Sequence, residues 1–354
     1  MQKGVDRMRT ALGIVAVLLL VSVIPSAANV TVGKPVQLRT PEGRYTMPSF
    51  SADSRYIAFS SERYDGLYTS DWQGNFSTIA KAPLAGWRYS WGPDGQSLAY
   101  RMRYGDTTSM AGMSASPDGR SQTQITDWQS DLFPPQCGKD GIEFKAGDDL
   151  LKVDESGNVK SVKSLSKGQG IVSRVAALSA AFFVNGFAAV TTTAFAALVP
   201  ASEGTSKGKS VFTNTGNELW TVDENGDMKK LLDVNGEPGF FNPQTSPTGD
   251  VVAASGLSGQ LYIADINTGN YINLGIGQNP TWSPDGRHLI YEVAKEDGHN
   301  LTGSELWLSS RDGRDRQQLD LNEGIKRYPS WSPDGRTLVY EVDGKIYYVP
   351  IERK

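Results

Sequence analysis

Short hydrophobic runs separated by polar turn signals recur along the whole chain. The runs at 288–293 and 337–342 are apolar at most positions, and each is as long as a typical strand. The same turn, Ser-Pro-Asp-Gly-Arg, precedes both runs at 283–287 and 332–336. Further apolar runs, such as 305–309, lie between other Gly- and Asp-rich turns. This pattern predicts an all-β protein of short strands joined by tight turns.

The turn is part of a longer repeat that begins with a large aromatic residue. Trp282 and Trp331 each stand directly before Ser-Pro-Asp-Gly-Arg, roughly 50 residues apart. Weaker copies are centred on Phe50, Trp91, Gln136 and Thr245. In such a turn Pro presets φ, Asp accepts hydrogen bonds from nearby amides, and Gly takes a left-handed position. The regular recurrence of the Asp favours a role in turn architecture over metal binding or catalysis.

Each repeat contains enough sequence for four strands, which predicts a β-propeller of four-stranded blades. By this register 116–119, although it also reads Ser-Pro-Asp-Gly, joins a third strand to a fourth. Strand candidates at 187–190 and 219–222 fill the gap between the Gln136 and Thr245 repeats. We therefore expect eight blades, with seven as the alternative. The last repeat lacks an outer strand, and we expect residues 32–38 to complete the C-terminal blade and close the ring.

Residues 1–28 have the features of a secretory signal peptide. Lys3, Arg7 and Arg9 precede an apolar stretch, and small residues end it before Asn29. We expect cleavage there, a propeller domain over 29–354, and an exported chain that is periplasmic or extracellular, with no stable membrane span after cleavage. The charge-free segment 175–199 leaves two alternatives, a second span or buried blade strands. Asn185-Gly186 is typical of a hairpin and favours strands.

The amino-acid composition limits which ligands and catalytic sites the chain is expected to have. The net charge is -4 with 35 basic and 39 acidic residues. The chain therefore lacks the basic excess that is typical of nucleic-acid-binding proteins. The single cysteine, Cys137, excludes an intrachain disulfide. With two His and no Gly-x-Ser-x-Gly elbow, the sequence predicts no metal site, no cofactor and no serine-hydrolase centre. A carboxylate pair for carbohydrate chemistry stays open, because folding alone decides which acids meet.

The Trp-Ser-Pro-Asp-Gly-Arg motif with its following Leu-Ile-Tyr or Leu-Val-Tyr strand resembles the TolB-type propeller repeat. We expect the small α/β domain that precedes the propeller in TolB to be absent, since only about twenty residues separate the expected signal from Phe50. The same repeat also occurs in the propellers of prolyl-peptidase-like hydrolases and in oligogalacturonate lyases. The resemblance therefore implies a fold and an exported binding scaffold, but it does not choose one function.

A propeller ligand is expected at one end of the central channel, where chain segments lead into the innermost strands. The residues three to five places before each aromatic position are rich in aromatic, Arg and amide side chains, a composition favoured at binding hot spots. The candidate binding residues are Tyr45, Trp87, Arg88, Phe133, Phe241, Asn242, Gln278, Asn279, Arg327 and Tyr328. We expect a protein or peptide partner in the cell envelope. The alternative is a carbohydrate-active enzyme, a polysaccharide lyase or glycoside hydrolase, acting on the same face.

Overall fold

A computed structural model describes most of the chain. The described residues are 30–130, 132, 134–138, 141–146, 149–153, 159–164, 182–184, 187–189, 210–213, 217–222, 228–297 and 300–353. The expected signal peptide, His299 and the candidate residue Phe133 lie outside them.

The N-terminal half of the described chain forms four-stranded antiparallel sheets, as the repeat predicts. The first contains β3 (Tyr45–Phe50), β4 (Tyr56–Ser61), β5 (Gly66–Asp71) and β6 (Phe76–Lys81). The second contains β7 (Ser90–Trp91), β8 (Leu98–Arg103), β9 (Met110–Ala115) and β10 (Gln122–Gln124). The third contains β11 (Gln136–Gly138), β12 (Gly141–Ala146), β13 (Asp149–Val153) and β14 (Val159–Ser164). In each sheet the strands pair in sequence order, so residues 116–119 join a third strand to a fourth as expected.

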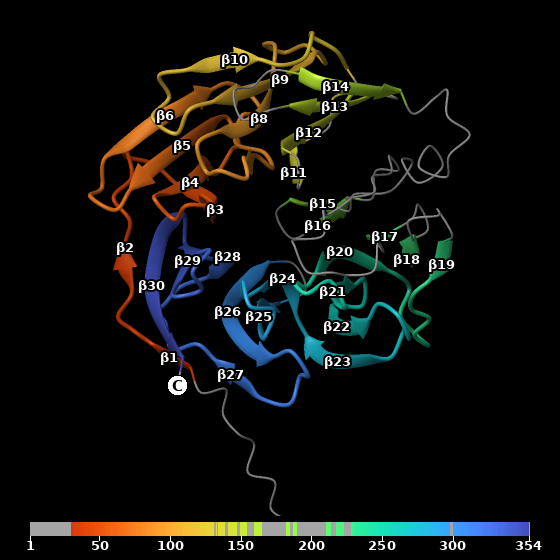
Figure 1. Cartoon of the computed structure of the whole chain (residues 1–354). Coiled ribbons are helices and arrows are strands. Elements are labelled where there is room, and N and C mark those ends of the chain that lie inside the picture. The colour runs from red at the N-terminus through yellow and green to blue at the C-terminus, as the bar shows by residue number, and fades with distance from the viewer. Residues whose placement is uncertain are drawn as a thin grey trace, which may run out of the picture.

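The C-terminal half repeats this arrangement. One sheet contains β20 (Phe240–Thr245), β21 (Val251–Gly256), β22 (Gln260–Asp265) and β23 (Tyr271–Ile276). The next contains β24 (Gln278–Trp282), β25 (His288–Glu296), β26 (Leu301–Ser310) and β27 (Arg316–Gln318). The sheets lie around a common centre, with β3, β20, β24 and β28 nearest to it and β6, β10, β23 and β27 at the rim (Figure 1).

Two smaller sheets lie between these halves. One pairs β15 (Phe182–Val184) with β16 (Phe187–Ala189), and the other contains β17 (Ser210–Thr213), β18 (Leu219–Val222) and β19 (Met228–Lys230). The strand candidates at 187–190 and 219–222 are thus strands, and β15 and β16 pair in the hairpin register that Asn185-Gly186 predicts. Most of the charge-free segment 175–199 lies outside the described residues. Nowhere in the described ranges is there a helix long and apolar enough to cross a membrane.

The last sheet joins the two ends of the described chain. It contains β28 (Lys326–Trp331), β29 (Thr337–Val342) and β30 (Lys345–Arg353). Two N-terminal strands, β1 (Val30–Val32) and β2 (Val36–Gln37), pair antiparallel with β30. The expected N-terminal addition to the C-terminal sheet is therefore present, but it is split into two short strands.

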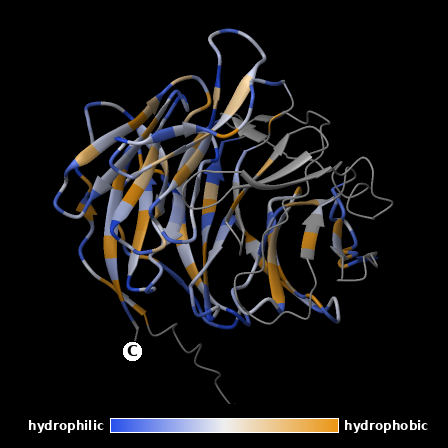
Figure 2. Cartoon of the chain, turned by 45° about the horizontal axis from the view of Figure 1, so that its top comes forward, coloured by the Kyte–Doolittle hydropathy of each residue, from blue (hydrophilic) through white to orange (hydrophobic). Residues whose placement is uncertain are grey.

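The repeated Trp residues are wedges between neighbouring sheets. Trp282 is 8% exposed and packs with Val251 and Leu261 of the preceding sheet as well as with Leu289 of its own. Its indole N–H donates to the Gln244 carbonyl of the preceding sheet at 2.8 Å. Hydrophobic residues are concentrated on the strands, and most of the connections are hydrophilic (Figure 2). Trp282 therefore ties its sheet to the one before it through both apolar contact and a hydrogen bond.

Hydrogen bonds inside each Ser-Pro-Asp-Gly turn confirm its architectural role. Ser283 Oγ donates to Asp285 Oδ1 at 2.6 Å, and the same oxygen accepts the Arg287 amide at 3.1 Å. Gly286 has φ of 67°, which is the left-handed position expected of it. The same Ser–Asp bond recurs at residues 51 and 53, 116 and 118, 310 and 312, and 332 and 334. These carboxylates act in the turn itself, as the recurrence of the motif indicates.

Candidate functional site

The two ends of the sheets carry different connections. Because the strands are antiparallel, the turns between strands one and two and between three and four lie at one end, which we call the turn face. The connections between strands two and three, and from strand four into the next sheet, lie at the other end. Most of the candidate binding residues lie at this second end.

A left-handed residue interrupts the innermost strand at the second end. Met47, Asn242, Asn279 and Tyr328 have φ between 50° and 52°, and each is followed by Pro. In all four strands the pairing register shifts at this point, which is a β-bulge. Arg88, at the equivalent place in the second sheet, has φ of 51°. We call this end the bulge face.

The bulge explains why these positions are unusual. Pro has no amide to contribute to the ladder and so suits a strand interruption. Asn tolerates the left-handed region, whereas Met, Arg and Tyr rarely occupy it. Backbone strain at such residues is a reason to look for function, because the surrounding fold must maintain it. Among these bulge positions, backbone strain is therefore expected at Met47, Arg88 and Tyr328.

Aromatic and Arg side chains from different sheets meet at the bulge face. The rings of Tyr64 and Trp87 pack edge to face with centroids 4.6 Å apart, and the Arg88 guanidinium lies 5.8 Å from the Trp87 ring. Arg327 lies 4.7 Å from the ring of Tyr328 and donates to its hydroxyl at 2.7 Å. We call these five residues the bulge cluster.

The electrostatics of the bulge cluster join its members. Burial raises the pKa of Tyr64, and a hydrogen bond with Tyr328 partly offsets this. Burial likewise raises the pKa of Tyr328, against the nearby charge of Arg327. Both phenols are therefore neutral donors at neutral pH. Tyr64 of the first sheet and Tyr328 of the last sheet thus lie close enough to influence each other.

Two buried carboxylates lie next to this group, at equivalent places on second strands. Glu292 is 1% exposed, and its Oε1 accepts the backbone amide of Tyr328 at 2.6 Å. Glu341 is 5% exposed, and its Oε2 accepts the hydroxyl of Thr46 at 2.5 Å. Each carboxylate therefore connects its own sheet to the bulge of the next.

Burial controls the ionisation of both carboxylates. It raises the pKa of Glu292 to about 7, although the Tyr328 amide and the charge of Arg327 oppose it. Burial also raises the pKa of Glu341, against the hydrogen bond from Thr46.

Arg101 occupies the equivalent second-strand place in the second sheet. Its Nη1 donates to the carbonyl of Leu132 at 2.6 Å, so it too reaches the next sheet. Burial and the charge of Arg88 lower the pKa of Arg101 to about 10. This second-strand position therefore carries a carboxylate in two C-terminal blades and a cationic guanidinium in the second blade.

The structure separates the sequence candidates into three groups. Trp87, Arg88, Arg327 and Tyr328 belong to the bulge cluster, whereas Gln278 and Asn279 contact Glu292. Asn242 forms a bulge and accepts a bond from Gln244. Phe241 is 9% exposed, and Tyr45 is buried between Phe59 and Tyr68. The prediction that Tyr45 faces a ligand is therefore not supported, because its ring packs in the core of the first sheet.

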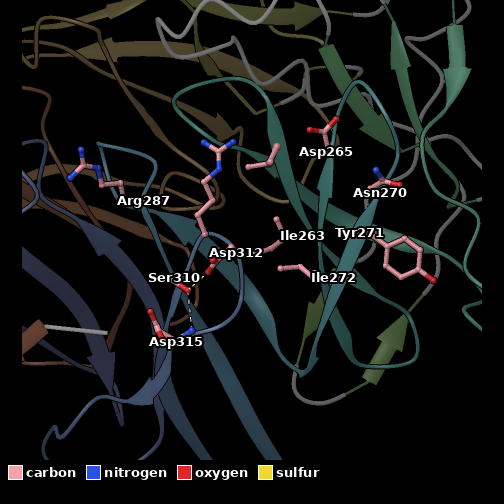
Figure 3. Close-up of a pocket in the computed structure, with 11 residues that line it drawn as sticks. Ile263, Asp265, Asn270, Tyr271, Ile272, Arg287, Ser310, Asp312 and Asp315 are labelled. Carbon is pink, nitrogen blue, oxygen red and sulfur yellow. Dashed lines mark hydrogen bonds between the residues drawn. The ribbon is translucent and has the colours of Figure 1, made fainter. Parts of the chain in front are cut away.

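A separate groove lies on the turn face, between the sheet that ends in β23 and the next one. Its volume is about 580 Å³. Ile263 and Ile272 form an apolar wall, while Asp312, Asp315 and Arg287 stand at its polar side (Figure 3). Ser310 and Asp312 are hydrogen-bonded within a turn, and Arg311 pairs with Asp250. Ser310, Arg311 and Asp312 of this groove are therefore already engaged within the protein.

Comparison with known proteins identifies the architecture. No protein-family model and no curated protein matches this chain. A chain of the mitotic checkpoint complex is similar in structure, with a TM-score of 0.58 at 12% identity over 99% of this chain and 98% of that one. The chain has a β-propeller fold. TolB from Acinetobacter baumannii also matches, with a TM-score of 0.43 at 18% identity over 82% of this chain and 57% of that one. At these identities the likeness concerns the fold alone, and each four-stranded sheet is a blade.

Sequence reasoning missed Tyr64, Arg101, Glu292 and Glu341. A signal for the last three was available, because each interrupts an apolar strand with a charged residue directly after Tyr. A charge in a buried strand requires a partner, and that partner belongs to the next blade. Tyr64 lies in an ordinary connection between β4 and β5, and nothing in its sequence context distinguishes it.

Proposed function

We propose that this chain is a binding scaffold that holds a protein or peptide at the bulge face, where the central channel of the propeller opens. The observation that carries the proposal is the bulge cluster. Its Trp, Tyr and Arg side chains come from separate blades, and three of them, Tyr64, Arg88 and Tyr328, occupy strained left-handed positions. These residue types dominate interaction hot spots, because they combine large apolar area with polar groups.

A peptide selection tests the proposal directly. A random peptide library is selected on the immobilised wild-type chain and, in parallel, on the W87A/Y328A double variant. We expect sequences enriched on the wild type to lose at least about tenfold in affinity on the variant, since truncated hot spots cost about 2 kcal/mol or more.

The control is Tyr271→Ala, because Tyr271 is an exposed aromatic residue of the turn-face groove. It should leave the selected peptides bound. A selection that enriches no sequence, or one whose peptides bind the double variant unchanged, contradicts the proposal.

We also propose that the propeller is a closed ring of eight blades, and that the chain is exported after cleavage before Asn29. The pairing of β1 and β2 with β30 and the two intermediate sheets support this count. Deleting residues 29–38 removes the buried Val30 and Leu38 from the joined sheet. We expect the deletion to lower the free energy of unfolding by about 2 kcal/mol or more. Unchanged stability would contradict closure, and an unprocessed N-terminus in the envelope fraction would contradict cleavage.

A carbohydrate-active enzyme on the same face is the second candidate. Glu292 and Glu341 favour it, because glycoside hydrolysis needs two acids and a raised pKa suits a proton donor. Against it, both carboxylates already hold the neighbouring blade. Activity of the purified chain on a polysaccharide panel, abolished by E292Q, would establish this alternative.

A further inference from the structure

The second blade carries basic side chains that lack acidic partners. Arg88, Arg101 and Arg103 form no ion pair within the described part of the chain, in contrast to Arg44 with Glu62 at 2.7 Å. Arg101 and Arg103 lie two residues apart on β8 and so project to the same side of the strand. Among the described residues, the bulge face therefore has a positive wall without acidic partners at this blade.

Hydrogen bonding on this wall is also incomplete. The Nε atoms of Arg101 and Arg103 are buried and have no hydrogen-bond partner among the described residues. A buried guanidinium donor without an acceptor costs free energy, and two cations that repel each other add to that cost. Arg88 contributes to this repulsion at Arg101. An anion bound at Arg88 would relieve the repulsion between these cations.

Arg88 is the member that solvent can reach. It is exposed, yet neighbouring atoms surround it closely enough that burial lowers the pKa of its guanidinium. The phenols of Tyr64 and Tyr328 are close enough to influence its charge, and the Trp87 ring lies beside it. The site around Arg88 thus offers one free cation, neutral donors and an aromatic face.

The opposite wall limits the charge that fits. Glu292 and Glu341 lie across the bulge cluster, and both are close enough to influence Arg327 and Tyr328. A doubly charged phosphate would be repelled more strongly by these acids than a single carboxylate would. A carboxylate also matches the planar guanidinium and accepts from it in a bidentate way.

We propose that the bulge face recognises a carboxylate of its peptide partner at Arg88. Arg101 and Arg103 add positive electrostatic potential at this site, and Trp87 supplies an apolar contact beside it. This inference rests on the proposed function, since it names the chemistry that the bulge cluster selects. The carboxylate comes either from an Asp or Glu side chain or from a free C-terminus.

The fold itself supplies a suitable variant. Asn occupies the position of Arg88 in two other blades, as Asn242 and Asn279, with the same left-handed φ. Arg88→Asn therefore removes the cation and keeps the bulge. Arg287→Asn is the matched control, because Arg287 is an exposed Arg of the turn face without an ion pair in the described ranges.

The test uses two random peptide libraries, one with an internal random segment and amidated ends, the other with a free C-terminal carboxylate. On the wild type we expect enrichment of Asp and Glu from the first library, or of free C-termini from the second, which identifies the source. For a selected peptide, Arg88→Asn should weaken binding by at least about tenfold, measured by fluorescence anisotropy. Replacing the peptide's carboxylate by its amide should weaken binding equally, and the two changes together should cost little more than either alone.

The outcomes separate this inference from the proposed function. If peptides are selected and depend on Trp87 and Tyr328, but show no acidic preference and bind Arg88→Asn unchanged, the carboxylate site is wrong while the scaffold function stands. If no peptide is selected, the scaffold proposal fails first. Equal weakening by Arg287→Asn would show a nonspecific charge effect and would also overturn the carboxylate site.

Discussion

The two faces of this propeller are made by the same repeat, but they differ in how completely their polar groups are satisfied. On the turn face, the Ser–Asp pair recurs with nearly the same hydrogen bonds in blade after blade. On the bulge face, equivalent positions carry Met47, Arg88, Asn242, Asn279 and Tyr328. One end of the repeat therefore encodes architecture, and the other end encodes differences between blades.

Charge shows the same contrast. A hydrogen bond from Ser310 lowers the pKa of Asp312 on the turn face, so the acid is stabilised within its own turn. On the bulge face the acids Glu292 and Glu341 reach into the next blade, and Arg101 does so with the opposite charge. Groups that bridge blades can be exchanged without altering the turns, which makes this face the one free to specialise.

The wedges between blades support both faces, so breaking one should disturb both. We expect Trp282→Ala to lower the free energy of unfolding by ~4 kcal/mol, because it leaves a large cavity and an unpaired Gln244 carbonyl. Urea denaturation measures this loss. Trp128→Ala is the control, since Trp128 is 40% exposed, and it should cost far less. Equal effects of the two substitutions would contradict the role of the wedge.

Sequence reasoning found the turn face almost completely. The recurrence of Trp282 and Trp331 with their turns gave the wedge, the turn and the order of the strands, because each depends on local residue chemistry. The bulge face was found only in part. Trp87, Arg88, Arg327 and Tyr328 were expected, but their partners Tyr64 and Glu292 come from other strands. Contacts between blades depend on how blades pack, and a repeat pattern alone does not contain that information.

The buried acid of the bulge face should make stability depend on pH. Its pKa is raised in the folded state to about 7. A raised pKa means that the folded protein keeps the proton when the unfolded chain has lost it. Stability is therefore highest below the ordinary Glu pKa and falls as pH rises toward 7, by ~3 kcal/mol for Glu292.

Glu292→Gln removes this titration while retaining an oxygen that accepts the Tyr328 amide. Between pH 4.5 and pH 8 the wild type should lose unfolding free energy relative to the variant. Any advantage of the wild type at pH 4.5 should therefore shrink or reverse at pH 8. Urea denaturation at both values measures it. A difference that is independent of pH would show that Glu292 is not a buried acid in the folded protein.

A turn-face substitution should affect stability and leave binding intact. Ser332 Oγ donates to Asp334 at 2.5 Å and accepts the Thr337 amide at 2.9 Å. We expect Ser332→Ala to cost about 1–2 kcal/mol, the usual loss for a hydroxyl that caps a local amide. Peptides selected on the wild type should bind the variant with unchanged affinity. Weakened binding by the fully folded variant would show that the two faces are coupled.

The smallest effect on stability is expected at Arg88, the left-handed residue of the second blade. Arg88 has φ of 51°, which Asn adopts in two equivalent bulges, and it forms no ion pair with the described residues. Arg88→Asn should therefore change the free energy of unfolding by less than about 0.5 kcal/mol, as for a surface position. Arg88→Val is the matched comparison, because a β-branched residue is poorly accommodated at positive φ. It should lose about 1–3 kcal/mol to backbone strain. If both variants are as stable as the wild type, the left-handed conformation is not maintained at this blade. If Arg88→Asn loses as much stability as Arg88→Val, the Arg88 side chain itself stabilises the fold, and the bulge face is not the end of the repeat that is free to vary.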